Sequence, residues 1–201
     1  MSDLFIKAKK VKDASRRIAN LSEIQKNYAL ECIAKKIMEN SSYILSENEK
    51  DMENAKNKGI KGALLDRLKL TYERLEQIYN GIYDVIRLSD PVGEVISMWR
   101  RPNGLVIGQK RVPIGAIGII YEARPNVTVD AAVLCLKAGN SVLLRGGSEA
   151  INSNLALVNT MKMGLQQADI DDGAVELLED TSRETAVSMM KLNDYLDLLI
   201  P

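Results

Sequence analysis

The feature that most constrains the fold is an alternation of short apolar runs and helix-length segments between residues 113 and 201. The apolar runs are GAIGII, SVLLR, AVELL and YLDLLIP. Continuous apolar runs of this length are typical of strands that are covered on both faces. The segments between them, such as TVDAAVLCLKAGN, have the length and composition of helices. Strands that alternate with helices predict an α/β fold with a doubly wound parallel sheet.

Residues 1–90 are predicted to form a helical layer. Ser22 and Gln25 form a capping box at the start of one helical pattern, and Thr71 opens another. Apolar side chains recur on one face of each pattern. Such a layer has to pack against another part of the chain.

Residues 91–112 read as a β arm. The runs VGEVISMW and LVIGQKRV flank the turn signal Asn103-Gly104. Basic residues punctuate both runs: Arg100, Arg101, Lys110 and Arg111. Charged side chains of this kind commonly protect exposed strand edges, and we expect them to do so here.

Charge and apolar content exclude several classes of partner. Lys plus Arg and Asp plus Glu number 27 each, so the formal net charge is +0. A dedicated binder of nucleic acid or anionic membranes would carry a basic excess. No apolar run approaches the ~20 residues of a transmembrane helix, and the start MSDLFIKAKK lacks the apolar core of a signal peptide. We therefore expect a cytoplasmic protein with no nucleic-acid or membrane partner.

The chemistry available to the chain is limited. Histidine is absent, which excludes Ser-His-Asp and Cys-His catalysis and every histidine-based metal site. The cysteines, Cys32 and Cys135, both fall in predicted helices and cannot form a zinc site, so no metal is expected. Any reaction must use Cys, Lys, Asp, Glu or Tyr side chains, or a cofactor.

Ligands of open α/β sheets bind at the carboxyl ends of the strands. Here those ends carry YEARPN, RGGS and EDTS. In RGGS, Arg145 precedes two glycines and Ser148, which could cap a helix; this pattern favours an anion. A flexible turn with a surface arginine explains the same residues equally well. The chain has no GxGxxG or GxxxxGK[ST] motif.

The YEARPN stretch places an amide at a strand end. Pro125 is expected to turn the chain away from helix, and Arg124 before it to be extended. Asn126 then lies just before the next helix. Its amide could cap that helix, or it could point into the cleft and stabilise an oxyanion.

The last predicted strand stops at Pro201 without a closing helix. We interpret the chain as a fragment of a longer protein, which would leave an unpaired apolar edge at YLDLLIP. The alternative is a complete small domain whose last strand lies at an edge of the sheet.

The string RVPIGAIGIIYEARPNVTVDAAVLCLKAGNSVLLRGGSEAINSN resembles the γ-glutamyl phosphate reductase family of the aldehyde dehydrogenase superfamily. LLDRLKL, DPVGE, NGL, EDTSRE and YLDLLIP extend the resemblance over essentially the whole chain. The resemblance implies that residues 113–201 are the first half of a Rossmann-like dinucleotide-binding domain. It also implies that the C-terminal catalytic domain is absent.

The family resemblance implies an activity. Members reduce L-glutamyl 5-phosphate to L-glutamate 5-semialdehyde with NADPH in proline biosynthesis, and a cysteine thiolate attacks the acyl phosphate. That cysteine lies in the later domain, so it is not in this chain. Cys135 and Cys32 are expected to be small buried hydrophobic residues. The chain alone is therefore expected to be inactive and to bind NADPH poorly.

The resemblance also implies site residues. Asn126 matches the amide that holds the oxyanion, and Arg145 matches the basic residue that contacts the adenosine ribose. Ser148 stands where NAD-preferring relatives have an acidic residue, so Arg145 without an opposing carboxylate suits the 2′-phosphate of NADP(H). The remaining residues expected along the cofactor are Ala123, Arg124, Pro125, Gly146, Gly147, Thr181 and Ser182.

Two other readings of the chain stay open. Residues 94–112 resemble the arm that pairs subunits in this superfamily, which implies a homo-oligomer. A shortened chain that keeps this arm could be an inactive module that dimerises or associates with a full-length partner. A generic α/β nucleotide binder is the third reading.

Overall fold

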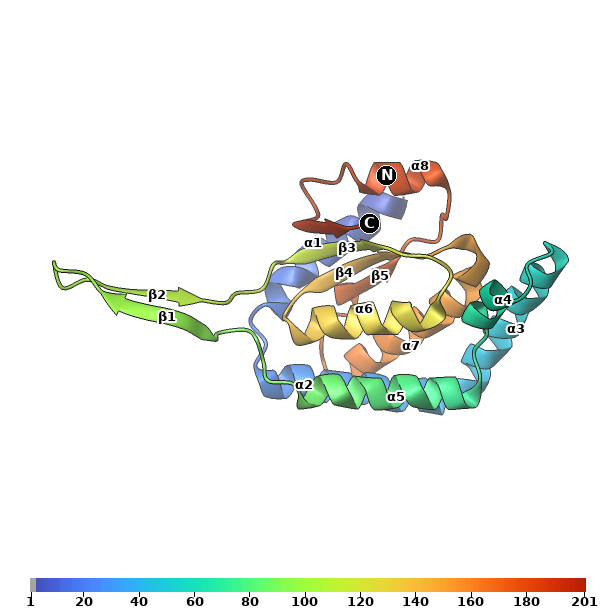
Figure 1. Ribbon diagram of the computed structural model, residues 1–201, viewed down its shortest axis with the longest axis horizontal. Coiled ribbons are helices and arrows are strands. Elements are labelled where there is room, and N and C mark those ends of the chain that lie inside the picture. Colours follow the sequence, from blue (N-terminus) through green and yellow to red (C-terminus); the bar gives the residue numbers. More distant parts are fainter. Residues whose placement is uncertain (1–2) are drawn as a thin grey trace.

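The computed structural model describes residues 3–201 (Figure 1). Within this range the α-helices are α1 (Asp3–Ile18), α2 (Glu23–Glu39), α3 (Ser41–Asn57), α4 (Ala63–Leu68), α5 (Tyr72–Arg87), α6 (Pro125–Lys137), α7 (Ile151–Gln167) and α8 (Arg183–Met189). The strands are β1 (Val95–Arg100), β2 (Val106–Lys110), β3 (Ala116–Ile120), β4 (Ser141–Arg145), β5 (Val175–Leu177) and β6 (Leu198–Ile200). Short 3-10 turns are η1 (Ser148–Ala150) and η2 (Asp172–Ala174).

The central sheet is parallel, as the alternating pattern predicts. Its strand order is β5-β4-β3-β6, and every neighbouring pair is parallel. Val142 and Leu144 of β4 face α6 and α7, whereas Leu143 faces α1. Both faces of β4 are therefore buried, which explains its uninterrupted apolar sequence. Strand β6 lies at an edge with Leu198 and Ile200 exposed, so the predicted apolar edge is present.

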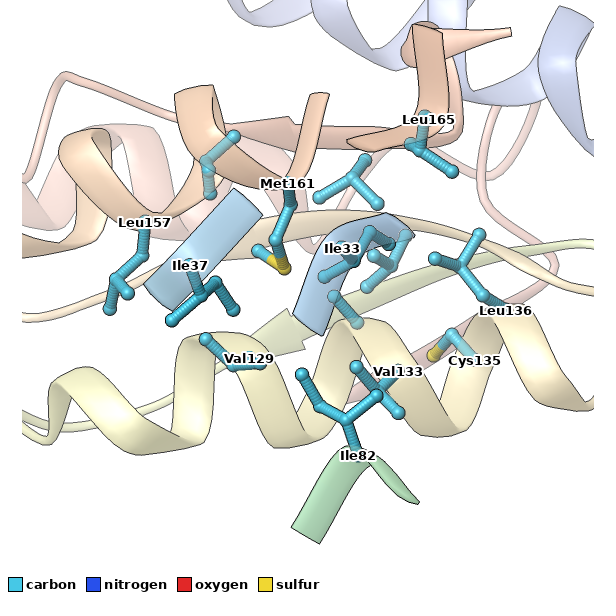
Figure 2. Close-up of a cluster of buried hydrophobic side chains, with 14 of the residues drawn as sticks. Ile33, Ile37, Ile82, Val129, Val133, Cys135, Leu136, Leu157, Met161 and Leu165 are labelled. Atoms are coloured by element: carbon cyan, nitrogen blue, oxygen red, sulfur yellow. The ribbon is translucent and has the colours of Figure 1, made fainter. Parts of the chain in front are cut away.

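Helices α2, α3 and α5 cover α6 and α7, whereas α1 lies on the opposite face of the sheet. Figure 2 shows the core between these layers, where α2 lies against α7, and α5 contributes Ile82 beside α6. Gly164 of α7 lets the two backbones approach closely, because a Cβ there would lie 2.6 Å from Ile33 Cα. Helices α2 and α5 thus share one hydrophobic core with α6 and α7, while Leu68 of α4 lies in a separate cluster.

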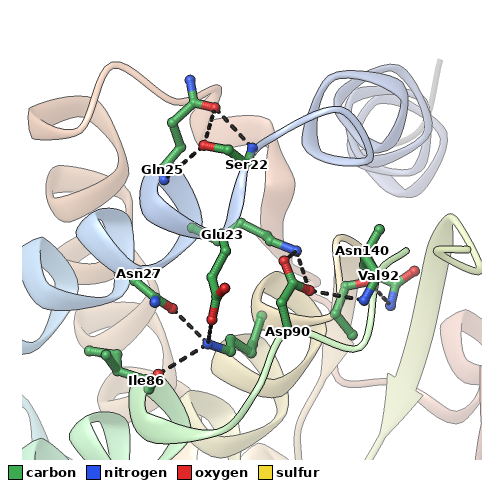
Figure 3. A network of polar contacts seen from close by, with 11 residues as sticks. Ser22, Glu23, Gln25, Asn27, Ile86, Asp90, Val92 and Asn140 are labelled. Atoms are coloured by element: carbon green, nitrogen blue, oxygen red, sulfur yellow. Dashed lines mark hydrogen bonds and ion pairs between the residues drawn. The ribbon is translucent and has the colours of Figure 1, made fainter. Parts of the chain in front are cut away.

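Polar contacts hold this layer together near the base of the β arm. Figure 3 shows the capping box, in which Ser22 Oγ accepts from Gln25 N at 3.3 Å and Gln25 Oε1 accepts from Ser22 N at 2.9 Å. Beside it, the buried Lys26 donates to Asp90 at 2.7 Å. The buried Lys137 of α6 donates to Asn27 Oδ1 at 2.7 Å. These cations join α2 to α6 and to the base of the β arm.

The arm itself is an antiparallel hairpin of β1 and β2 that projects away from the body (Figure 1). Its turn is at Gly104, whose φ of +87° suits glycine, as the Asn-Gly signal predicts. Every residue of β1 is exposed, including Trp99. Among residues 3–201, no helix is long and apolar enough to cross a membrane.

Two local expectations are wrong. Pro125 does not turn the chain away from helix; it is the first residue of α6, where a missing N–H costs nothing. Asn126 therefore lies inside the first turn and is not the cap. Ser148 does not cap α7 either, because the cap position is Ala150. Arg124 is extended, as expected, with φ −134° and ψ 96°.

Candidate functional site

A cavity of about 710 Å³ opens where β3 and β4 end. The strand ends stay paired, since Tyr121 N donates to Arg145 O at 3.0 Å. Residues expected along the cofactor line this cavity: Ala123, Arg124, Arg145 and Gly147. The rest of its wall is formed by Ile60, Leu64, Arg67, Leu68, Ile120, Tyr121, Glu122, Glu149 and Pro201. Two of the three predicted strand ends therefore meet in one cavity.

Arg145 brings the third strand end beside the second. Its Nη2 donates to the carbonyl of Thr181, and to that of Ser182 at 3.3 Å. Its Nε–H is buried and has no acceptor among the described residues. The charge of Arg145 also helps to lower the pKa of Asp180, although hydrogen bonds from Thr185 and Ser182 are the main causes. Arg145 thus lines the cavity, and its Nε–H is a buried donor without a partner among the described residues.

The hydroxyl of Ser182 is engaged by its own helix. Ser182 Oγ accepts from Thr185 N at 3.2 Å and caps α8. Ser182 does not line the cavity, and neither do Pro125, Gly146 and Ser148. The connection of Ser182 to the cavity is indirect, through Arg145.

The two glycines after Arg145 serve the packing of the protein itself. A Cβ at Gly146 would lie 2.3 Å from Asn154 Nδ2, and one at Gly147 would lie 3.1 Å from Ala123 N. Side chains here would displace neighbouring protein atoms. The expected role of these glycines, room for a ligand against the backbone, is therefore not needed to explain them.

A buried polar chain that the sequence did not reveal supports the end of β3. Tyr121 OH lies 2.7 Å from Thr128 Oγ1, and Thr128 Oγ1 donates to Asn154 Oδ1 at 2.8 Å. Burial raises the pKa of Tyr121, so its phenol stays neutral. The chain ties β3 to α6 and α7 and holds the following loop in place.

Asn126 lies next to this cavity and not in it. It lines a second cavity of about 430 Å³, and its Nδ2 lies 3.3 Å from Asp130 Oδ2. Arg67 and Arg124 line both cavities, so the two spaces adjoin at these side chains. This position excludes the capping alternative, and the role of the Asn126 amide as an oxyanion donor stays a prediction.

One premise of the NADP assignment is wrong. Arg145 does not stand in a cavity free of carboxylates, because Glu149 and Glu122 line the same wall. Ser148 occupies the position matched to an acidic residue, but Glu149 follows directly and its Oε2 would lie 2.9 Å from a Cβ at Gly147. Position alone in the sequence could not indicate which of these side chains reaches the cavity.

The cysteines are buried, as expected. Cys32 and Cys135 are free thiols and line neither cavity. Burial raises the pKa of Cys135 to about 12, so its thiol is protonated at neutral pH. Between residues 3 and 201, no group of three or more His, Cys, Asp or Glu side chains is placed to hold a metal ion.

Known proteins resemble the chain along its whole length. Gamma-glutamyl phosphate reductase of Caldicellulosiruptor saccharolyticus is 79% identical over 201 residues, which are 100% of this chain and 48% of that protein. The protein of the same name from Anoxybacillus flavithermus is 56% identical, over 100% of this chain and 49% of the relative. The chain therefore spans about half the length of the curated relatives it matches. No protein-family model matches it.

Solved structures agree with this similarity. The crystal structure of gamma-glutamyl phosphate reductase from Thermotoga maritima has a TM-score of 0.97 and 46% identity, and the match covers 100% of this chain and 48% of that one. A probable aldehyde dehydrogenase from Listeria monocytogenes has a TM-score of 0.73 at 14% identity, over 98% and 40% of the two chains, which shows a shared fold. In sequence and in fold, the chain corresponds to the N-terminal part of gamma-glutamyl phosphate reductases, which have the aldehyde dehydrogenase fold.

Proposed function

We propose that the chain forms the cofactor-binding part of an enzyme that reduces L-glutamyl 5-phosphate to L-glutamate 5-semialdehyde with NADPH and releases phosphate. This is a step of proline biosynthesis, and we place it in the cytoplasm. The whole-length similarity to gamma-glutamyl phosphate reductases supports the reaction. The observation that carries the cofactor assignment is the buried, unpartnered Nε–H of Arg145 at a cavity where strand ends meet.

The residues around this cavity fit a nicotinamide dinucleotide. Ala123 and Arg124, with Pro125 behind them, would lie along the nicotinamide half of the cofactor. The backbone of Gly147 would also lie against the cofactor. The guanidinium group of Arg145, which lines the cavity, would donate a charge-assisted hydrogen bond to the 2′-phosphate. Ser182, with Thr181, would lie near the pyrophosphate. When bound, NADPH supplies the hydride for the reduction.

Asn126 is proposed as the donor that holds the oxyanion of the substrate. Its present contact with Asp130, at 3.3 Å, is long for a hydrogen bond and is therefore easily exchanged for a substrate oxygen. The nucleophile has to come from outside these residues, because the thiols of Cys32 and Cys135 are buried away from both cavities. We therefore propose that the 201-residue chain alone is inactive and binds NADPH weakly.

A chimera tests this assignment. Residues 1–201 would be joined to the remaining C-terminal part of the Caldicellulosiruptor saccharolyticus protein. We expect NADP-dependent oxidation of glutamate semialdehyde by the chimera and none by the chain alone. Asn126→Ala in the chimera should lower kcat by about a hundredfold, as for other oxyanion donors. Activity of the isolated chain would contradict the view that its nucleophile is missing.

The β arm supports an alternative function as an association module. A free two-stranded ribbon is marginally stable in water, yet this one exposes large apolar side chains on both faces: Val95, Ile96, Met98, Trp99, Leu105 and Val106. We propose that two copies of the chain pair through these arms. Size-exclusion chromatography with light scattering should give a dimer, and Trp99→Asp a monomer. A monomeric wild-type chain argues against this role.

A further inference from the structure

The second cavity, of about 430 Å³, has a charged wall. It is lined by Asp66, Arg67, Lys69, Leu70, Arg74, Gln77, Ile78, Arg124, Asn126 and Asp130. Four of these side chains are cationic and two are anionic at neutral pH. The chain as a whole has a net charge of +0, so the cationic excess is a local property of this cavity.

One cation of this wall is already neutralised. Arg74 Nη2 donates to both carboxylate oxygens of Asp66, at 3.0 and 3.1 Å. Its Nη1 donates to the carbonyls of Asp66 and Lys69, at 2.5 and 2.6 Å. These bonds cap the end of α4, and the ion pair balances the charge of Asp66 against that of Arg74.

Three cations of the wall remain uncompensated. Arg67, Lys69 and Arg124 form no ion pair with any residue between 3 and 201, and all three are exposed. The only other carboxyl group on the wall is Asp130. Burial raises the pKa of Asp130, and the hydrogen bond from Asn126 only partly opposes this. The cavity therefore presents two guanidinium groups, those of Arg67 and Arg124, that form no ion pair with any residue between 3 and 201.

The start of α6 adds to this positive field. Arg124 occupies the N-cap position, and no side chain there accepts from the first-turn N–H groups. A helix of 13 residues directs a partial positive charge to this end. Arg124 and Asn126, which line the cavity, belong to this uncapped turn. Pro125 has no N–H and Val127 N donates to Arg124 O at 3.0 Å, so it is the helix dipole, and not a set of free N–H groups, that adds to the field of the arginines.

We propose that this cavity binds the phosphoryl group of an acyl phosphate, with Arg67 and Arg124 as its anion-binding residues. Both arginines also line the cofactor cavity, which places the anion next to the proposed nicotinamide site. A planar guanidinium binds a phosphoryl group through two parallel hydrogen bonds. The choice of an acyl phosphate, over any other phosphoryl compound, rests on the proposed function.

Titration of the 201-residue chain with inorganic phosphate, followed by the backbone amide signals of Asn126 and Val127, tests this site. Arg67→Gln and Arg124→Gln should each weaken phosphate binding about tenfold or more, as expected for loss of a charged hydrogen-bonding partner. Neither substitution removes a contact within the structure, so both variants should fold. Arg67→Lys keeps the charge but lacks the planar guanidinium group, so its affinity for phosphate should lie between those of the unchanged chain and Arg67→Gln. Arg16→Gln on α1, also exposed and unpaired, is the matched control.

Further titrations distinguish between the possible anions. L-glutamate at equal ionic strength supplies carboxylates without a phosphoryl group and should not shift these signals. Phosphate should still bind when NADPH is present, because the cofactor phosphate has its own cavity. Absence of phosphate binding, equal binding in Arg67→Gln, displacement by NADPH, or a stronger response to glutamate would each overturn the proposal. The NADPH titrations use the chimera, because the isolated chain is proposed to bind NADPH weakly. Failure of the chimera to bind NADPH, with phosphate binding intact, would count against the proposed function and not against this site.

Discussion

Asp51 of α3 caps helix α7 through Ser153, a residue 102 positions away in the sequence. Asp51 Oδ2 accepts from Ser153 N at 2.7 Å and from Ser153 Oγ at 2.6 Å. Its Oδ1 accepts from Asn152 N at 3.2 Å and from Asn152 Nδ2 at 2.7 Å. The outer helical layer thus supplies the cap that α7 lacks locally, and it places a carboxylate at the positive end of the helix.

Removing this cap should destabilise the whole chain. Asp51 is 1% exposed, so Asp51→Ala leaves buried N–H groups unsatisfied. We expect the free energy of unfolding to fall by about 2–4 kcal/mol, measured by urea denaturation. Asp13→Asn, at an exposed position of α1, is the control and should change it by less than about 0.5 kcal/mol. Equal effects of the two substitutions would show that the cap is not a stabilising contact.

Gly115 should not tolerate a side chain. Its φ is +125°, and a Cβ would lie 2.2 Å from Asp197 Oδ2, which accepts from Ala116 N at 2.8 Å. Gly115→Ala should therefore lower the free energy of unfolding by about 2 kcal/mol or more. Gly81→Ala, inside α5 with nothing within 4 Å, should instead raise it by about 0.5–1 kcal/mol. Thermal melting should show a lower melting temperature for Gly115→Ala and a higher one for Gly81→Ala than for the unchanged chain.

Asp90 should make stability fall in acid. Burial raises its pKa, but hydrogen bonds from Lys26 and Val92 N–H outweigh burial and hold the pKa below its ordinary value of 3.8. A carboxyl group whose pKa is lower in the folded state stabilises the fold above its unfolded pKa, and that stability is lost as pH falls through the folded pKa. The urea concentration at the midpoint of unfolding should therefore fall when the pH is lowered below about 4. Asp90→Asn should be less stable at pH 7 and show a smaller acid dependence; an unchanged dependence would falsify this assignment.

Glu149 should oppose NADPH in the cofactor cavity. Its carboxylate lines the same wall as Arg145, and like charges repel a 2′-phosphate. In the chimera, Glu149→Gln should tighten NADPH binding several-fold, by about 1 kcal/mol, and leave NADH binding nearly unchanged. Fluorescence titration with both cofactors measures this. A loss of NADPH affinity would show instead that Glu149 holds the ribose.

The sequence by itself determined the elements of this fold. Alternating apolar runs predicted the parallel strands, and the local signals at Ser22 and Thr71 marked helix starts correctly. These features depend on neighbours within a few residues, so short-range chemistry is sufficient to specify them. The strand ends that carry Arg145 and Ala123 were predictable for the same reason.

Only the tertiary structure decided which of these residues meet. It placed Asn126 inside the first turn of α6, capped α7 from Asp51, and set Glu149 in the cavity of Arg145. It also brought Arg67 to Arg124, from helices that the sequence separates by a whole β arm. These pairings arise when the helical layer packs on the sheet, and burial and hydrogen bonding between distant segments select them. No periodicity along the chain encodes that choice, because its free energy comes from contacts made after the layers meet.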